Sequence, residues 1–138
     1  MSSPVPWGDA KTKFEAAALI DPTLVSWPNE GFVVPAPQDV TAWIAVEMTS
    51  TVLEPIELGG AVWEEAGILW VHIFVPWGSG SDVARLLAKN VVNAYRSLPV
   101  GDITYTRASF GDGGRDEVNG NWWRMTASIE WQYQDITV

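Results

Sequence analysis

The sequence predicts an α+β fold: a mixed, largely antiparallel sheet with a long hairpin, packed by two helices. Apolar residues make up 47% of the 138 residues and charged residues only 18%, which is the balance of a folded globule. Residues 67–80, GILWVHIFVPWGSG, read as an apolar strand that turns through two glycines into the amphipathic segment 81–98. One domain over residues 1–138 is expected, because two cores would each lack surface to bury.

The N-terminal third is expected to contain a short helix and an extended segment. Asp9 is placed to cap a helix that runs to about Ile20, just before an Asp-Pro pair that ends it. A brief strand over 24–27 follows. The segment 28–37 contains three prolines, whose missing N–H donors favour an extended path on the surface.

Residues 41–75 predict a long β-hairpin. Apolar and polar side chains alternate over 41–52, and this strand is expected to run on past an edge or bulge at Pro55. A glycine pair then reverses the chain, and the returning strand is expected to be interrupted near Ala66 and Gly67. Its inner part is expected to be buried on both faces, whereas the outer end of the hairpin carries four acids: Glu54, Glu57, Glu64 and Glu65.

The main helix is expected after Ser81, whose hydroxyl can cap it. Strands over 103–110 and 121–133 follow, the second with a nearly unbroken period of two. Between them, GDGGRDEVNG (111–120) is polar and glycine-rich, so we expect a mobile loop in the free monomer. The buried face of the helix is predicted from apolar residues at helical spacing: Val83, Leu87, Val91, Ala94 and Leu98.

Nine tryptophans are more than one small core easily encloses, because each buries roughly 150–250 Å² and its indole N–H needs a partner. Those within strand patterns are expected in the core: Trp70, Trp123 and Trp131. Those beside prolines or glycines are expected in loops that contact another subunit: Trp7, Trp27 and Trp77.

The composition excludes several classes of function. A net charge of −9 opposes specific DNA binding, although an acidic channel wall would let a duplex pass without sticking. No apolar stretch is long enough to cross a membrane, and the N-terminus lacks the features of a signal peptide. The absence of cysteine excludes disulfides and thiolate metal sites and fits assembly in a reducing cytoplasm.

We expect no cofactor, no metal and no catalytic residues. Gly78-Ser79-Gly80 lies between strand and helix as a dinucleotide turn does, but Val83 replaces the third glycine and no phosphate-binding lysine follows. His72 is the only histidine and lies in an apolar strand, so a structural role is expected. The adjacent acid pairs 64–65 and 116–117 are expected to be solvated surface, and the acids of the glycine loop lack the spacing of an EF-hand.

Several motifs in succession resemble one family. Trp27-Pro28-Asn29 follows the short helix, 73–80 reads IFVPWGSG, Ala108-Ser109-Phe110-Gly111 ends a strand, and a last strand runs from Trp123-Arg124 to Trp131-Gln132. In their order and spacing these motifs are similar to the tail terminator proteins of long-tailed phages and of gene-transfer agents. The resemblance implies one tail-terminator-like domain that forms a hexameric ring on the head-proximal end of the tail tube in the virion, after assembly in the host cytoplasm.

Such a ring would stop tube growth and join the tail to the neck, with the chain itself, the tube protein and a neck or head-completion protein as partners and DNA passing through. Two alternatives stay open: another neck or head-completion ring protein, and a monomeric carbohydrate-binding module. The candidate residues for contacts with subunits, tube or neck are Glu54, Glu57, Trp63, Glu64, Glu65, Asp112, Arg115, Asp116, Glu117, Trp7, Trp27 and Trp77.

Overall fold

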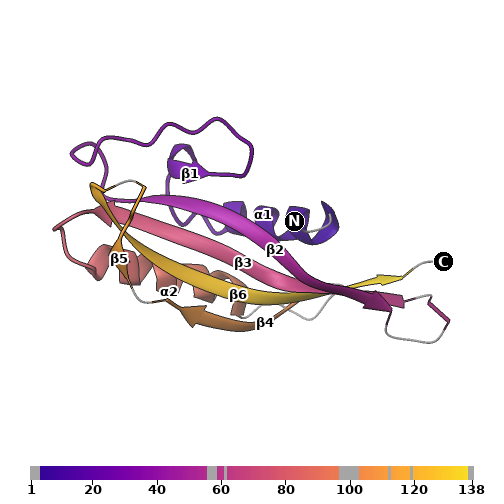
Figure 1. Cartoon of the computed structure of the whole chain (residues 1–138). Helices are drawn as coiled ribbons and strands as arrows, with labels where there is room; N and C mark the ends of the chain where they lie inside the picture. Colours follow the sequence, from indigo (N-terminus) through magenta and orange to yellow (C-terminus); the bar gives the residue numbers. More distant parts are fainter. Residues whose placement is uncertain are drawn as a thin grey trace.

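In a computed structural model, six strands form one mixed sheet, accompanied by two α-helices and a short 3-10 helix (Figure 1). The structure describes residues 4–55, 59–60, 62–96, 103–111, 113–118 and 120–136. This arrangement confirms the predicted α+β class. In chain order the elements are α1 (Pro4–Ala16), η1 (Pro22–Leu24), β1 (Val25–Ser26), β2 (Trp43–Pro55), β3 (Val62–Pro76), α2 (Asp82–Arg96), β4 (Ile103–Phe110), β5 (Gly114–Arg115) and β6 (Trp122–Ile136).

The sheet has the strand order β1-β2-β3-β6-β4, with β5 also paired to β6. Among the described strands, only the two-residue β1 is parallel to its neighbour, and the other pairs are antiparallel. The long hairpin of β2 and β3 is confirmed, with pairs from Trp43–Phe74 to Pro55–Trp63. The sheet is therefore built on two long central strands, β3 and β6.

The expected interruption of β3 near Ala66 and Gly67 is wrong, because β3 is continuous and the irregularity lies on its partner. The register shifts between Ser50 and Val52 of β2, opposite Ala66 and Gly67. Gly67 has no side chain, and a Cβ built there would lie 1.9 Å from the carbonyl oxygen of Thr49. The glycine therefore allows β2 to approach closely instead of ending β3.

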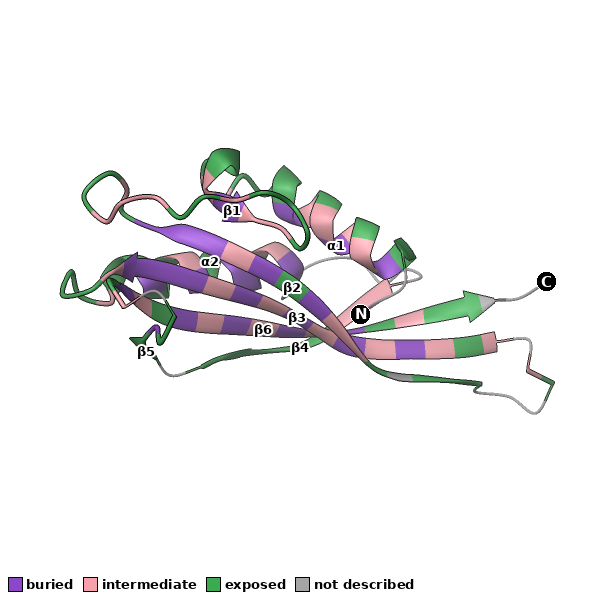
Figure 2. Cartoon of the chain, turned by 45° about the horizontal axis from the view of Figure 1, so that its top comes forward, coloured by how far each residue is buried: buried purple, intermediate pink, exposed green. Residues whose placement is uncertain are grey.

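Both helices cover the same face of the sheet (Figures 1 and 2). Side chains of α1 and α2 share one buried cluster with every second residue of the central strands, and the Tyr95 hydroxyl of α2 donates to the Ala10 carbonyl of α1 at 2.7 Å. On β3 only residues 73–75 are buried on both faces, so the expectation of two-sided burial holds at that end alone. Trp70 and His72, further along the uncovered face, are partly exposed.

The segment before β2 covers one end of the sheet face that the helices leave uncovered. Residues 31–36 have no regular structure, as the prolines predicted. Phe32 stacks on Trp43, which stacks in turn on Phe74 with ring centroids 4.0 Å apart. Trp122 completes this second buried cluster. The two faces of the sheet thus have separate apolar clusters.

The tryptophan assignments are confirmed only in part. Trp131 is 1% exposed in the main core, whereas Trp70 and Trp123 are partly exposed. Trp43 and Trp122 are buried in the second cluster, for which the sequence contains no local signal. A period of two shows which residues share a face but not which loop covers that face.

The predicted first helix is wrong in its boundaries. α1 begins at Pro4 and ends at Ala16, so Asp9 lies inside the helix and not at its cap. The Asp9 carboxylate pairs with Lys13 one turn later and accepts a hydrogen bond from the Tyr105 hydroxyl at 2.6 Å. Asp9, which the sequence indicated as a helix cap, therefore makes a tertiary contact with a residue far away in the sequence.

The second helix is confirmed, but its buried face is rotated from the predicted one. Val83, predicted inside, is 44% exposed, and Leu98 lies outside the described residues. Two alanines bring the helix close to the sheet, and Tyr95 reaches α1 from the same face. The buried residues are Ala84, Ala88, Val91, Val92 and Tyr95.

Replacing Gly67 by alanine is expected to destabilise the fold by about 1–3 kcal/mol, because the new methyl group would overlap the Thr49 carbonyl and the Trp131 ring. Urea unfolding followed by tryptophan fluorescence measures the change. Gly31→Ala is the matched control, since nothing lies within 4 Å of its Cβ position. Equal stability of the two variants would contradict this account of the bulge.

Stability is expected to fall as the pH rises above about 10. Burial, followed by the nearby Asp9 carboxylate, raises the pKa of Tyr95 and Tyr105 well above the usual value for a phenol. The folded chain therefore keeps two protons that the unfolded chain releases. Urea midpoints between pH 7 and 11 test this, and Tyr105→Phe should show a shallower loss at alkaline pH. A variant with an unchanged alkaline slope would disprove the role of Tyr105.

Candidate interaction surfaces

β3 leads into α2 through a tight glycine turn. Gly78 and Gly80 have φ angles of 86° and 88°, which side-chain-bearing residues rarely adopt. Both the backbone N–H and the hydroxyl of Ser79 donate to the Pro76 carbonyl, at 3.1 and 2.7 Å. The carbonyl of Ser81 accepts from the Arg85 N–H at 2.9 Å and so starts the helix. The predicted strand, turn and helix are confirmed, and the glycines serve the reversal of the chain.

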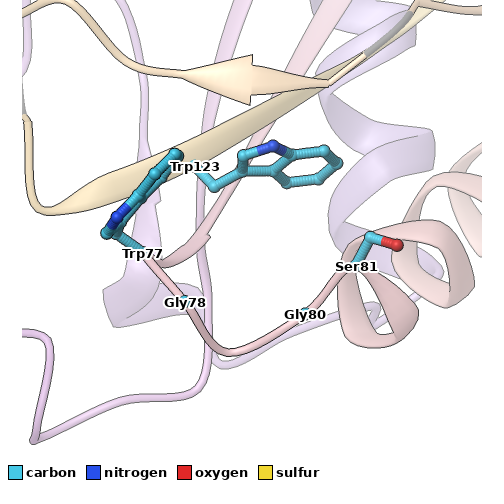
Figure 3. Close-up of a pocket in the computed structure, with 5 residues that line it drawn as sticks. All are labelled: Trp77, Gly78, Gly80, Ser81 and Trp123. Carbon is cyan, nitrogen blue, oxygen red and sulfur yellow. The ribbon is translucent and has the colours of Figure 1, made fainter.

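Two tryptophans form a shallow notch over this turn (Figure 3). Trp77, from the turn, and Trp123, from β6, line a hollow of about 440 Å³. Trp77 is 52% exposed, an unusually open position for so large an apolar side chain. The aromatic notch consists of Trp77, Gly78, Gly80, Ser81 and Trp123.

The described residues of the glycine-rich loop pack against this notch, while the mobility of the loop in the free monomer stays a prediction. β5 pairs with Trp123 and Arg124 and takes over the edge of β6 where β4 ends. The Arg115 guanidinium lies 4.8 Å from the centroid of the Trp77 ring, a cation–π contact, and its Nε donates to the Gly120 carbonyl at 2.6 Å. The backbone N–H and C=O groups of β6 that β4 leaves unpaired become hydrogen-bond partners for the loop. The composition of the loop alone does not predict this pairing.

Asp116 is also not the solvated acid that the sequence suggested. It is only 6% exposed, its N–H donates to the Trp122 carbonyl at 2.9 Å, and its carboxylate lies 4.0 Å from Arg124. The neighbouring Glu117 is exposed. Asp112 falls outside the described residues. The pair 116–117 is thus split between a structural and a solvent-facing acid.

The outer end of the hairpin extends beyond the helices as an arm (Figures 1 and 2). The arm consists of residues 53–55 of β2, 62–65 of β3 and 133–136 of β6, which pair side by side. Trp63, 37% exposed, donates its indole N–H to the Gly60 carbonyl at 3.0 Å. Leu53 is 61% exposed. The arm therefore presents apolar side chains without a covering helix.

The arm carries acids in two different settings. Glu54 and Glu64 are direct cross-strand partners on β2 and β3. Glu65, expected at the solvated surface, is only 4% exposed, because it points to the opposite side of the strand from Glu64. Glu57 falls outside the described residues.

Trp7 and Trp27 lie together on the helical side of the sheet. Trp7 is in α1 and not in a loop, and its ring meets Trp27 edge-on at 5.7 Å. Trp27 also packs edge-on against Phe14 at 5.4 Å, and Lys11 lies 4.9 Å from its ring centroid. Both tryptophans are partly exposed, so each has contacts within the chain and a remaining free surface.

The uncovered face carries the single histidine. The two ring nitrogens of His72 lie 2.8 Å from the Thr126 hydroxyl and 2.9 Å from the Glu47 carboxylate, so each has a hydrogen-bond partner. Within the described part of the chain, no group of three or more acids and histidines is placed to hold a metal ion. None of the helices described is long and apolar enough to cross a membrane.

The candidate residues thus gather at separate places and not in one cleft. Trp63, Glu54 and Glu64 lie on the arm, whereas Trp77 and Arg115 lie at the other end of β3. Sequence reasoning missed Trp123 as a lining residue, because its strand pattern indicated core. Leu53 was not predicted as a surface residue either. The alternation of side chains along β2 was the signal that could have identified it as an exposed apolar residue in an acidic segment.

Gly113 is expected to be essential for the notch. A Cβ built there would lie 1.6 Å from the ring of Trp123, so Gly113→Ala should displace either the ring or the loop. Near-ultraviolet circular dichroism and proteolysis of the loop would report the change. Gly114→Ala is the control, because nothing lies within 4 Å of its Cβ position. Identical spectra and protease resistance in both variants would show that the loop does not depend on this contact.

Comparisons with known proteins give two similar folds and one family. A solved structure of a protein without a descriptive name has a TM-score of 0.66 and 19% identity, covering 95% of this chain and 98% of that chain. A chain from the virion of a native gene transfer agent particle has a TM-score of 0.59 and 14% identity, covering 91% and 92%. No curated protein sequence matches. The family described as phage tail terminator protein matches residues 9–131, and the chain therefore belongs to this family.

Proposed function

We propose that six copies of the chain form a ring on the head-proximal end of a phage tail tube. The ring stops polymerisation of the tube, joins the tail to the neck and leaves an acidic channel for DNA. Its partners are its own copies, the tail tube protein and a neck or head-completion protein. The observation that carries the proposal is the family match over residues 9–131.

Membership of the family makes the chain a structural protein of the virion tail. The proposal adds the ring, its position and its action on the tube. The similarity of fold to a chain of a gene transfer agent virion supports it, because that fold occurs in an assembled particle. We propose further that residues 1–138 act as one domain without enzymatic activity.

The strand order suits closure into a ring. A ring requires two different complementary patches on each subunit, so that one copy joins the next head to tail. β2 and β4 lie at opposite sides of the sheet, and beyond the two residues paired with β1, neither has a second strand partner among the described residues. These two edges offer the unlike surfaces that such a contact needs.

The charge of the chain suits a conduit for DNA. Six copies with a net charge of −9 carry 6 × −9 = −54. An acidic wall repels phosphates, so a moving duplex is not held by it. The charge also makes ring formation sensitive to ionic strength, because exposed charges are screened over about 8–10 Å in ordinary buffers.

The positions of the exposed tryptophans do not favour a carbohydrate-binding module. Such a module needs aromatic side chains on one face, where they stack on a sugar chain. Trp63 lies near the first residue of β3, and Trp77 directly follows its last. The two most exposed indoles are thus separated by the length of a 15-residue strand.

Electron microscopy of purified chain mixed with purified tail tubes tests the function. The expected result is a ring at one end of each tube and no further growth when tube subunits are added. Tailless heads provide the comparison that identifies a neck protein. Binding to heads but not to tubes, or no binding to either, would refute the terminator function.

The aromatic notch and the arm are proposed as contact surfaces for the tube, the neck or a neighbouring subunit. Trp77→Ala should fold normally, since the indole is half exposed, but should cap fewer tubes. Val33→Ala is the matched control, because Val33 is an 89% exposed apolar residue in the segment before β2. Equal capping by the two variants would remove Trp77 from the contact surface and leave it as a cover over the turn.

A further inference from the structure

One flank of α2 is basic and exposed. Its charged residues are Arg85, Lys89 and Arg96, spaced so that they share one side of the helix. Among the described residues, no carboxylate lies within 4.0 Å of any of the three, and Asp82 in the first turn is the only acid of the helix. We call Arg85, Lys89 and Arg96 the basic flank.

The basic flank lies beside β4, at one edge of the sheet. Arg96 lines a hollow of about 100 Å³ together with Thr106 and Arg107 of β4. Arg107 is 80% exposed along its side chain, and its Nε lies 3.8 Å from the Glu130 carboxylate. Residues 106–110 of β4 are all exposed. This edge therefore combines positive charge with a strand that has a free side.

The opposite side of the sheet carries an unfavourable pair of acids, one on the edge strand β2 and one on β3. Glu54 of β2 and Glu64 of β3 face each other directly across the strands, an arrangement in which like charges destabilise a sheet. No described basic side chain lies within 4.0 Å of either carboxylate. We call Glu54 and Glu64 the acidic pair. A cation from outside the chain would remove the repulsion.

We infer that the basic flank of one copy binds the acidic pair of the next copy. This inference rests on the proposed ring and names the two surfaces that join its subunits. The surfaces have opposite charge and lie on opposite sides of the domain, the acidic pair on β2 and β3 and the basic flank on α2 beside β4, as a head-to-tail contact requires. The arm projects beyond the helices (Figure 1), Glu54 is exposed and Glu64 is partly exposed, so this pair is accessible to a neighbour.

Charge reversal tests the contact. R85E/K89E gives two acidic surfaces and E54K/E64K gives two basic ones, so each variant alone should form rings on tubes only at about tenfold or more higher concentration than the native chain. A 1:1 mixture of the two should restore assembly, because alternating subunits meet with opposite charges in any ring with an even number of members. A single chain with all four reversals should also assemble.

The control is E15K/D39K, which makes the same change in net charge as E54K/E64K at exposed positions away from both surfaces. It should assemble like the native chain, and circular dichroism should show that every variant folds. Raising the salt concentration should weaken the native ring and the four-reversal ring alike.

Three outcomes would overturn the contact. Native-like rings from R85E/K89E and E54K/E64K alone would show that other surfaces join the subunits, while the terminator function would stand. If R85E/K89E forms rings that cap tubes but do not let DNA pass, the basic flank lines the channel and does not join subunits. A native chain that stays monomeric on tubes would refute both this contact and the proposed ring.

Discussion

All fifteen residues of β3 pair with β6, from Val62 opposite Ile136 to Pro76 opposite Trp122. This unbroken register determines which side chains face the helices, because a shift by one residue would turn every side chain to the other face. It places Leu69 beside Ile129 in the core. It also brings Trp123 to the turn after β3, where the notch forms. The arm at one end and the notch at the other are therefore consequences of one pairing.

The helices protect only one face, and this asymmetry explains the distribution of aromatic residues. On the covered face, Trp131 is enclosed by the main cluster, over the position where Gly67 leaves space. On the other face, Trp43 and Phe74 stack under a loop and bury their rings without a helix. A loop covers less of a sheet than a helix does, so partly exposed residues such as Trp70 remain on that face. The high tryptophan content thus serves two clusters and also leaves exposed rings for contacts.

Much of this fold could be predicted from the sequence wherever a local pattern decides the structure. The alternation of β6 and the glycine turn after β3 were sufficient to give the strands and the start of α2. Where contacts between residues distant in sequence determine the structure, the local patterns gave wrong predictions. Asp9 looked like a cap but binds Tyr105, and Val83 looked buried although Ala84 occupies the buried face.

The candidate surfaces were less predictable than the fold for the same physical reason. A polar, glycine-rich composition usually indicates a free loop, but residues 114–116 pair with the edge of β6 that β4 leaves open. The acidic hairpin was evident, whereas the cross-strand pairing of Glu54 with Glu64 depends on the bulge at Ser50 and Val52. Register is a property of two strands together, and neither strand specifies it alone.

The acids of the arm have one more consequence, for the free chain. An unpaired strand edge is a template on which other chains add strands without limit, and this leads to aggregation. On the outer edge of β2, Glu54 repels an approaching edge of the same kind, and Pro55 has no N–H to offer it. The net charge of −9 acts in the same direction, because it opposes the close approach of free chains.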